Sequence, residues 1–372
     1  MKVGTRPALK IAIVAPLVSA IREPQGGGSQ AFVSDLARGL VSRGHGVHVY
    51  AAAGSQIPGV TVIDTGVDPR SLAATLYRAG GSSGRDPDAA WPAFASTYRA
   101  VRETRYDVVH NHAFDAPAIS LAAGLDAPVV HTLHLPPEKA VAGALGIATQ
   151  GRRVPAVACV SMSQAKAWRT VTRVDAILPP YVPTRSVPWS EAAGDGAVFA
   201  GRLSPEKGAV EAIDIAQSAG IRIDVYGDAY DAEYAREQID PRRGEPGVRV
   251  HGGVPRTAMW AVMARASVVV CPARWDEPFG MAAADALACG TPVVAFNRGG
   301  LGEIISDGVT GFLVAPDDIQ GAADGVRRIT QISRAACREH AERHLDLERS
   351  LDAHEQLYRR VIRNHAGAAV RG

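Results

Sequence analysis

Short runs of apolar and β-branched residues alternate with helical patterns along the whole chain. In the first half these runs cover residues 10–16, 47–52, 60–64, 107–112, 128–134 and 156–161. In the second half they cover residues 197–201, 221–227, 248–252, 267–273 and 292–297. Strands that alternate with helices are typical of βαβ units and parallel sheets. The pattern therefore predicts an α/β protein with two doubly wound parallel sheets.

A proline-rich stretch separates the two sets of predicted strands. It covers residues 179–196, PPYVPTRSVPWSEAAGDG, and its prolines exclude a helix or a central strand. The chain has 372 residues, about twice the usual size of one domain. We predict a first domain over residues 1–183 and a second over residues 184–372. The charged amphipathic helix expected over residues 346–364 either packs on the second domain or crosses back to the first.

Composition and charge indicate a packed globular protein and argue against a nucleic-acid partner. Hydrophobic residues make up 47% and charged residues 21% of the chain, which is ordinary for such a protein. The net charge is +2 without a basic tail, so we expect no nucleic-acid partner. The four cysteines show no metal-ligand spacing. No apolar run approaches the roughly 20 residues of a membrane-spanning helix, so we expect a cytoplasmic protein that could still dock on a membrane surface.

Two glycine-containing turns follow predicted strands. Residues 25–29, QGGGS, precede a predicted helix, and glycines let a backbone approach a phosphate closely. This loop does not match the dinucleotide motif G-x-G-x-x-G, so by itself it indicates either a flexible turn or a phosphate cradle. Residues 202–208, RLSPEKG, follow another strand, with a helix expected to open near Glu206. Arg202 and Lys207 would then lie beside a helix N-terminus and suit a diphosphate; the alternative is a solvated surface turn.

Two carboxylates flank the segment EPFGMAAAD that follows the strand at residues 267–273. Glu277 lies in the loop, and Asp285 comes eight residues later in a predicted helix. If both lay on one helix face, they would be roughly 12 Å apart and suit an elongated polyhydroxylated ligand. A purely structural, capping or solvated Asp285 is the alternative.

The segment EPFGMAAADALACGTPVVA resembles the signature of the retaining glycosyltransferases of family 4, which have the GT-B fold of two facing Rossmann-like domains. The resemblance extends to QGGG, DVVHNH, GRLSPEKG and GGLGEIISDGVTGFLV in other parts of the chain. It implies that the first domain takes the acceptor and the second the nucleotide-sugar donor. It also departs from the pattern at one position, since Asp285 stands where the family usually has Glu, which shortens its reach toward the ribose.

The resemblance implies a role for each matching position. Arg202 and Lys207 would bind the donor diphosphate, and Glu277 would accept hydroxyls of the donor sugar. Asp285 would bind the ribose, and His134 could line the acceptor cleft. Further contacts to the donor are expected from His112, which would face the anomeric carbon, and from the backbone at Gly27, Gly28, Phe279, Gly280 and Met281. Glu303 is either close to the cleft or caps a helix.

The resemblance implies transfer of a sugar from a nucleoside-diphosphate sugar to a hydroxyl of a sugar, natural product or glycolipid, with retained configuration. Uridine is the commonest base of the family and guanosine the alternative. We expect no cofactor and no metal, because the cations and helix starts would stabilise the leaving group. Asp86 and Asp88 form a D-x-D pair, but their Gly/Ser-rich loop favours a solvated turn over a metal site.

Other functions remain open. A nucleotide-sugar epimerase of the same fold and a non-catalytic nucleotide-sugar-binding protein are the alternatives, whereas phosphorylases of this fold need a pyridoxal-bearing lysine and a longer chain. The acceptor would bind the loops at residues 17–28, 78–91 and 134–151. These loops carry few clustered charges, which favours a soluble sugar or natural product over a charged lipid head group.

Overall fold

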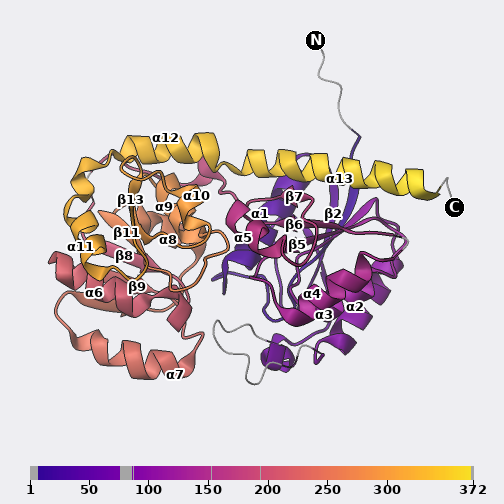
Figure 1. Cartoon of the computed structure of the whole chain (residues 1–372), viewed down its shortest axis with the longest axis horizontal. Coiled ribbons are helices and arrows are strands. Elements are labelled where there is room, and N and C mark those ends of the chain that lie inside the picture. The colour runs from indigo at the N-terminus through magenta and orange to yellow at the C-terminus, as the bar shows by residue number, and fades with distance from the viewer. Residues whose placement is uncertain (1–6, 76–85, 87, 152, 193, 370–372) are drawn as a thin grey trace, which may run out of the picture.

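The computed structural model describes residues 7–75, 86, 88–151, 153–192 and 194–369. Each half of the chain forms one parallel sheet covered by helices (Figure 1). The first sheet has the order β3-β2-β1-β4-β5-β6-β7 and the second the order β10-β9-β8-β11-β12-β13. The predicted fold class, two Rossmann-like doubly wound domains, is confirmed.

The first sheet consists of β1 (Lys10–Val14), β2 (Gly46–Ala51), β3 (Thr61–Asp64), β4 (Val108–Asn111), β5 (Val129–Leu133), β6 (Ala156–Cys159) and β7 (Ala176–Ile177). The second consists of β8 (Ala197–Ala200), β9 (Ile223–Tyr226), β10 (Val248–His251), β11 (Val268–Cys271), β12 (Val293–Phe296) and β13 (Gly311–Val314). All eleven predicted strands are present. The pattern missed β7, which has only 2 residues, and β13, whose run GFLV begins with a glycine that disfavours a strand.

The helices of the first domain are α1 (Gly28–Ser42), α2 (Trp91–Arg102), α3 (Ala116–Ala122), α4 (Lys139–Ala148) and α5 (Met162–Trp168). Those of the second are α6 (Ala209–Ala219), α7 (Ala232–Tyr234), α8 (Arg256–Met263), α9 (Met281–Ala288), α10 (Leu301–Ile304), α11 (Ile319–Arg327) and α12 (Arg334–His344). Helix α13 (Leu347–Ala369) ends the described chain.

Strand β1 shows why the central strands are apolar at successive positions. Ile11 and Ile13 belong to the core on one face of the sheet, and Ala12 and Val14 to the core on the other. Successive side chains of a strand point to opposite faces, and both faces of a parallel sheet are covered by helices. Every position of β1 after Lys10 is therefore buried.

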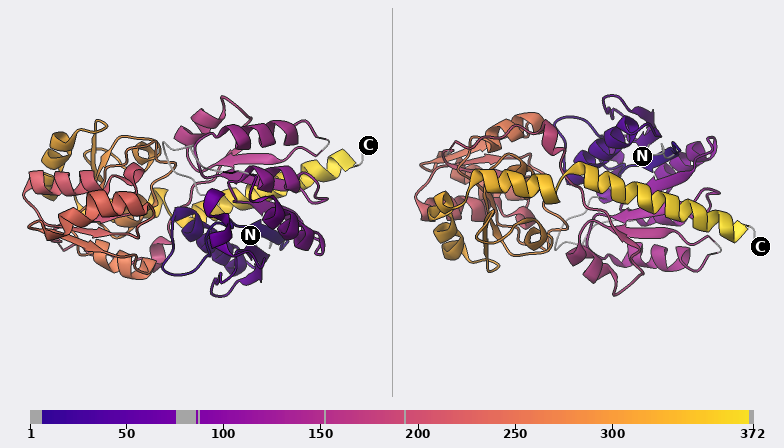
Figure 2. Two further views of the ribbon diagram at one scale, coloured as in Figure 1. Left: turned by 90° about the horizontal axis from the view of Figure 1, so that it is seen from below. Right: turned by 90° about the horizontal axis from the view of Figure 1, so that it is seen from above.

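The final helix, whose placement the sequence leaves open, lies on the first domain. Figures 1 and 2 show α13 continuing from α12 and extending along the first domain to its far side. Leu351 and Tyr358 of α13 join the core of that domain. A Cβ at Gly39 of α1 would lie 2.7 Å from Cδ1 of Leu351, so glycine permits this close approach.

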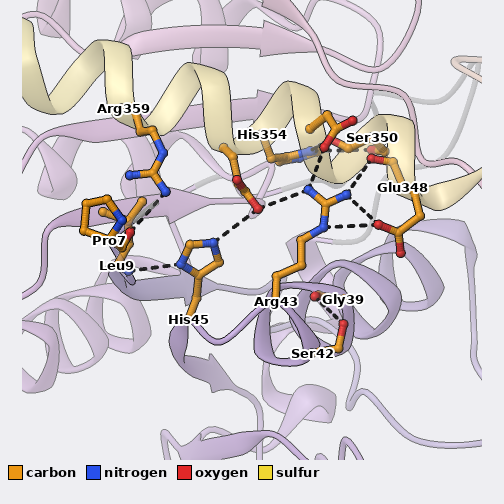
Figure 3. A network of polar contacts seen from close by, with 12 residues as sticks. Pro7, Leu9, Gly39, Ser42, Arg43, His45, Glu348, Ser350, His354 and Arg359 are labelled. Atoms are coloured by element: carbon orange, nitrogen blue, oxygen red, sulfur yellow. Dashed lines mark hydrogen bonds and ion pairs between the residues drawn. The ribbon is translucent and has the colours of Figure 1, made fainter. Parts of the chain in front are cut away.

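Ion pairs add to the contact between α1 and α13. Figure 3 shows Arg43, at the end of α1, reaching toward the acidic residues of α13. Its guanidinium lies 2.5 Å from Glu348, 2.8 Å from Asp352 and 3.0 Å from Glu355. His45 Nε2 lies 3.3 Å from the same Glu355 carboxylate. The C-terminal helix is thus part of the first domain's structure.

The chain passes between the domains twice at adjacent points. The amide of Val182 donates to the carbonyl of Leu345 at 2.8 Å, and the amide of Leu347 donates to the carbonyl of Val182 at 2.9 Å. Both crossings therefore lie side by side. Figure 1 shows the two sheets on either side of this connection.

Candidate functional site

A cavity of about 480 Å³ lies between the two domains. Its walls come from loops that follow strands of both sheets, as expected for ligand sites of open α/β sheets. The first domain contributes the glycine loop, Phe114, His134 and Val160, among others. The second contributes the turns after β8 and β11 and the start of α9. Most of the residues predicted to contact a donor therefore line one cavity, whereas Asp285 and His112 do not.

Arg202 and Lys207 both line this cavity. The helix expected near Glu206 is a single 3-10 turn over Pro205–Lys207, and α6 begins only at Ala209. Gly208 separates the two with φ +77°, and a Cβ there would lie 2.0 Å from the carbonyl oxygen of Pro272. Only glycine fits this left-handed, crowded position. It turns the chain so that Lys207 faces the cavity before the helix starts.

The guanidinium of Arg202 is held from two sides. Its Nη2 donates to Glu206 Oε1 at 3.0 Å, and its Cζ lies 4.1 Å from the centre of the Tyr230 ring. Glu206 is itself buried and accepts from Ser204 Oγ at 2.7 Å. The sequence indicated the Arg202 cation but neither Glu206 nor Tyr230 as its partner, and these two side chains fix the direction of the guanidinium.

Lys207 and Glu277 form an ion pair inside the cavity. Nζ lies 2.9 Å from Oε1 and 2.7 Å from Oε2 of Glu277. Trp275, which also lines the cavity, donates from Nε1 to the same Oε2 at 2.8 Å. The resemblance implied that Lys207 and Glu277 contact different parts of a donor, so their pairing was not predicted. Nor was a site role for Trp275 predicted, although this residue lies only two positions before Glu277.

The backbone of Phe279, Gly280 and Met281 lines the cavity at the start of α9. Gly280 has φ +108°, and a Cβ there would lie 2.7 Å from Cδ2 of Leu301. The amide of Gly300 donates to the carbonyl of Glu277 at 2.7 Å. The segment around Gly300 thereby holds the EPFG loop in place.

The glycine loop of the first domain meets the start of α9. Gly26, Gly27 and Gly28 line the cavity. A Cβ at Gly28 would lie 3.0 Å from Cγ of Met281. Glycine here permits the close approach of the two domains, and its role toward a phosphate stays a prediction.

Asp285 lies outside the cavity wall. Glu277 precedes α9, whereas Asp285 lies within it, so the expectation that both share one helix face is wrong. Both carboxylate oxygens of Asp285 accept from Arg256, at 3.1 Å from Nε and 2.8 Å from Nη2. Arg256 Nη1 also pairs with Asp35 of α1 in the other domain. In the structure Asp285 therefore belongs to an ion cluster between the two domains and does not point into the cavity where a donor would bind.

The role of Arg256 between the two domains was not predicted from the sequence. Besides its two carboxylate partners, its backbone amide donates to Glu23 at 3.0 Å. Asp35 is 221 positions away along the chain, so no local pattern could indicate the pair. Burial raises the pKa of Asp35, and Arg256 opposes this shift.

The histidines are arranged differently from the prediction. His112 is fully buried, and His134 lines the cavity in its place. His112 Nδ1 lies 3.0 Å from His134 Nε2, so one ring donates to the other. The expectation that His112 faces the donor sugar is therefore wrong for this structure, because His112 is fully buried and its ring is hydrogen-bonded to His134, which lines the cavity instead.

More histidines surround this pair. His110 Nδ1 lies 2.6 Å from the Tyr358 hydroxyl of α13, and the rings of His110 and His112 are 4.0 Å apart. Burial lowers the pKa of His134 to about 3 and those of His131 and His354 to about 4. These rings are thus neutral near pH 7, and neutral rings can pack at such distances without charge repulsion.

We expect the free energy of unfolding to fall by several kcal/mol as the pH decreases from about 7 to about 4. In this window the histidines of the unfolded chain take up protons around pH 6.5, whereas the buried rings of the folded chain begin to do so only near the lower end. Denaturant unfolding at stepped pH values measures the slope. His134→Asn should reduce it, and His344→Asn, at an exposed position, should not. A stability independent of pH over this range would contradict the buried neutral cluster.

Glu303 caps a helix of the other domain. Its carboxylate accepts from the amides of Met162 at 2.9 Å and Ser163 at 2.6 Å, at the start of α5. It is not part of the cavity wall described above. Of the two explanations left open by the sequence, the structure shows capping, across the domain boundary.

Most of the predicted acceptor loop at residues 78–91 lies outside the described residues, namely 78–85 and 87. Of its D-x-D pair, Asp88 accepts from Trp91 Nε1 at 3.0 Å and donates its amide to Asp86. Among the described residues no group of three His, Cys, Asp or Glu side chains is arranged to hold a metal ion. Nor is any helix in the described part of the chain long and apolar enough to cross a membrane.

Comparisons with known proteins agree with this architecture. The family model described as Glycosyltransferase Family 4 matches residues 26–185, and that described as Glycosyl transferases group 1 matches residues 195–344. A D-inositol 3-phosphate glycosyltransferase of Xylanimonas cellulosilytica is 31% identical over 90% of this chain and 94% of that protein. A glycogen synthase of Mycobacterium tuberculosis is 32% identical, but the match covers only 64% of this chain and 63% of that protein.

Among solved structures, HepE of Anabaena in complex with UDP-glucose has a TM-score of 0.71. The superposition covers 94% of this chain and 99% of that protein at 21% identity, and so bears on the fold alone. The two matched models span both domains, and the inositol-phosphate enzyme matches nearly full length. The chain therefore belongs to the group 1 glycosyltransferases of the GT-B fold and is a glycosyltransferase.

Proposed function

We propose that this protein transfers a sugar from a UDP-sugar to a hydroxyl of a small sugar or natural-product acceptor, with retention at the anomeric carbon. The observation that carries the proposal is the convergence of Arg202, Lys207 and Glu277 in one interdomain cavity. We propose uridine as the base because it is the commonest base of the family that the sequence resembles; HepE, which shares the fold, was solved with UDP-glucose. The named relatives act on different acceptors, so the acceptor class rests on the weakly charged loops of this chain.

Arg202 and Lys207 would stabilise the departing diphosphate. Breaking the anomeric C–O bond places negative charge on the phosphate oxygens, and preorganised cations at that point supply the largest catalytic effect. Lys207 contacts both oxygens of Glu277. A diphosphate bound at Arg202 would share this ammonium, leaving Glu277 free to accept sugar hydroxyls. These cations would take the place that a metal ion has in other transferases.

Retention by a covalent intermediate requires a carboxylate on the face of the sugar opposite the leaving group. Among the described residues, Glu277 is the single acid that lines the cavity, and Lys207 and Trp275 already hold it. We therefore propose attack from the side of the leaving group. The acceptor oxygen bonds to the anomeric carbon as the bond to the phosphate breaks, and a phosphate oxygen takes the acceptor proton.

The experiment is an assay of nucleoside diphosphate release. UDP-glucose, UDP-N-acetylglucosamine and GDP-mannose are each incubated with the protein, with and without a panel of sugars, inositols and natural-product alcohols. We expect release from a UDP-sugar that depends on the acceptor and persists in a chelator, and a product with retained configuration by NMR.

Other outcomes identify the alternatives. Conversion of the sugar nucleotide without any acceptor would indicate an epimerase. Tight binding of a nucleotide sugar without any conversion would indicate a non-catalytic binding protein. A loss of activity in chelator would contradict the metal-free mechanism alone.

A further inference from the structure

Trp275 lies where Lys207 and Glu277 meet, and no part of the family signature named above assigns it a role. Its indole Nε1 donates to Glu277 Oε2 at 2.8 Å. Its ring also lies beside the ammonium, with Lys207 Nζ 5.0 Å from the ring centre. One side chain thus contacts both partners of the ion pair in the cavity.

The two oxygens of Glu277 are not equivalent as a result. Oε2 accepts from Lys207 at 2.7 Å and from Trp275 at 2.8 Å. For Oε1 the structure gives one donor, Lys207 at 2.9 Å. A carboxylate oxygen has about two lone-pair sites, so Oε1 retains capacity for a further donor, whereas Oε2 is filled.

The loop that carries Trp275 is hydrogen-bonded to the turn at residues 202–208, which carries both cations. The amide of the preceding residue, Arg274, donates to the carbonyl of Glu206 at 2.9 Å. Glu206 in turn binds Arg202. The indole itself packs against the core of the second domain. Its N–H therefore has a fixed direction relative to both cations, as a preorganised donor requires.

We propose that Trp275 is the positioning residue for Glu277, and that it directs the hydroxyl of the donor sugar to Oε1. The proposal rests on the proposed function, because it assumes that Glu277 accepts from a sugar. Its physical basis is that Trp275 remains a neutral donor to Oε2 even when a bound diphosphate draws Lys207 toward itself. One lone-pair site of Oε2 is then still occupied, whereas both sites of Oε1 are open to sugar hydroxyls.

Trp275→Phe is the diagnostic variant. Phenylalanine keeps an aromatic ring beside Lys207, and it removes the N–H donor together with one ring of the indole. Hydrogen bonds to charged groups contribute enough that we expect kcat to fall about 10–100-fold, with a change in donor KM below about threefold. Trp189→Phe is the matched control: it lies in the same domain, 41% exposed and outside the cavity wall, and should leave kcat unchanged.

A double-mutant cycle separates positioning from packing. If Trp275 acts through Glu277, Trp275→Phe should have no further effect on turnover in a Glu277→Ala background. If the indole only fills space, its loss should cost the same factor in both backgrounds, which would overturn the proposal. Wild-type kcat in the single Trp275→Phe variant would overturn it as well.

A measurement without substrate separates this inference from the proposed function. The chain has five tryptophans, so ¹⁵N-labelled protein gives a small set of indole resonances, and Trp275→Phe identifies that of Trp275. We expect Glu277→Ala to move this resonance upfield and accelerate its exchange with water, without effect on that of Trp189. An unchanged Trp275 resonance would overturn the proposed contact. The expected shift together with no turnover of any donor would support the contact and contradict sugar transfer.

Discussion

Replacing Lys207 by alanine should lower turnover about 10²–10³-fold and leave the protein folded, because this is the loss typical for one preorganised donor at a developing anion. The variant removes a cation of the cavity, and Arg202 alone cannot neutralise the charge of the leaving diphosphate. Glu277 loses one of its two partners, yet Trp275 still donates to it at 2.8 Å. We therefore expect destabilisation of no more than about 2 kcal/mol. Diphosphate release and thermal unfolding measure the two effects.

Lys166→Ala is the control for this prediction. Lys166 is an exposed lysine of α5 in the first domain, and its removal changes the net charge by the same amount. It should leave turnover within a factor of about two, since it does not line the cavity. If Lys207→Ala retained the wild-type rate with the donor that supports activity, the assignment of the cation site would fail.

Replacing Arg256 by methionine should destabilise the protein by about 3–5 kcal/mol, the cost of removing one member of a buried ion cluster. The change leaves the buried carboxylates of Asp35 and Asp285 without their shared cation. Denaturant unfolding measures the loss. Arg236→Met is the matched control, because Arg236 pairs with Glu237 at the surface, with side chains 66% and 52% exposed. Such a pair contributes at most about 1 kcal/mol.

The pH dependence of the Arg256 variant provides a second check. Without the cation, burial holds the pKa of Asp35 above its ordinary value, so the folded variant binds protons that the unfolded chain releases. Stability of the variant relative to the wild type should therefore improve as the pH falls from neutral toward the ordinary pKa of an aspartate. If the difference in free energy of unfolding between the variant and the wild type stays constant over this range, lost packing and not unpaired charge causes the destabilisation.

The predicted strands were found because the information for them is local. Runs such as KIAIV are apolar at successive positions, since both faces of the sheet are covered. The glycine at the start of β13 and the 2-residue length of β7 weaken that signal. Their place at the sheet edges comes from pairing with β12 and β6, which no local pattern records.

For the candidate site, too, local features could be predicted from the sequence and long-range contacts could not. Residues that follow a strand directly, such as Arg202, Lys207 and Glu277, could be placed at the cavity from the sequence. Which side chain contacts which could not be predicted. Glu277 is separated from Lys207 by 70 residues, and Arg256 from Asp35 by 221.

The amino-acid sequence by itself determined the two doubly wound domains, the family and the set of polar residues at the strand ends, because hydrophobic periodicity and short motifs are local properties of the chain. The tertiary structure decided that α13 completes the first domain, that His134 and not His112 reaches the cavity, and that Asp285 belongs to Arg256. The physical reason is that hydrogen bonds and ion pairs depend on distances of about 3 Å, and only the packing of the two domains sets these distances.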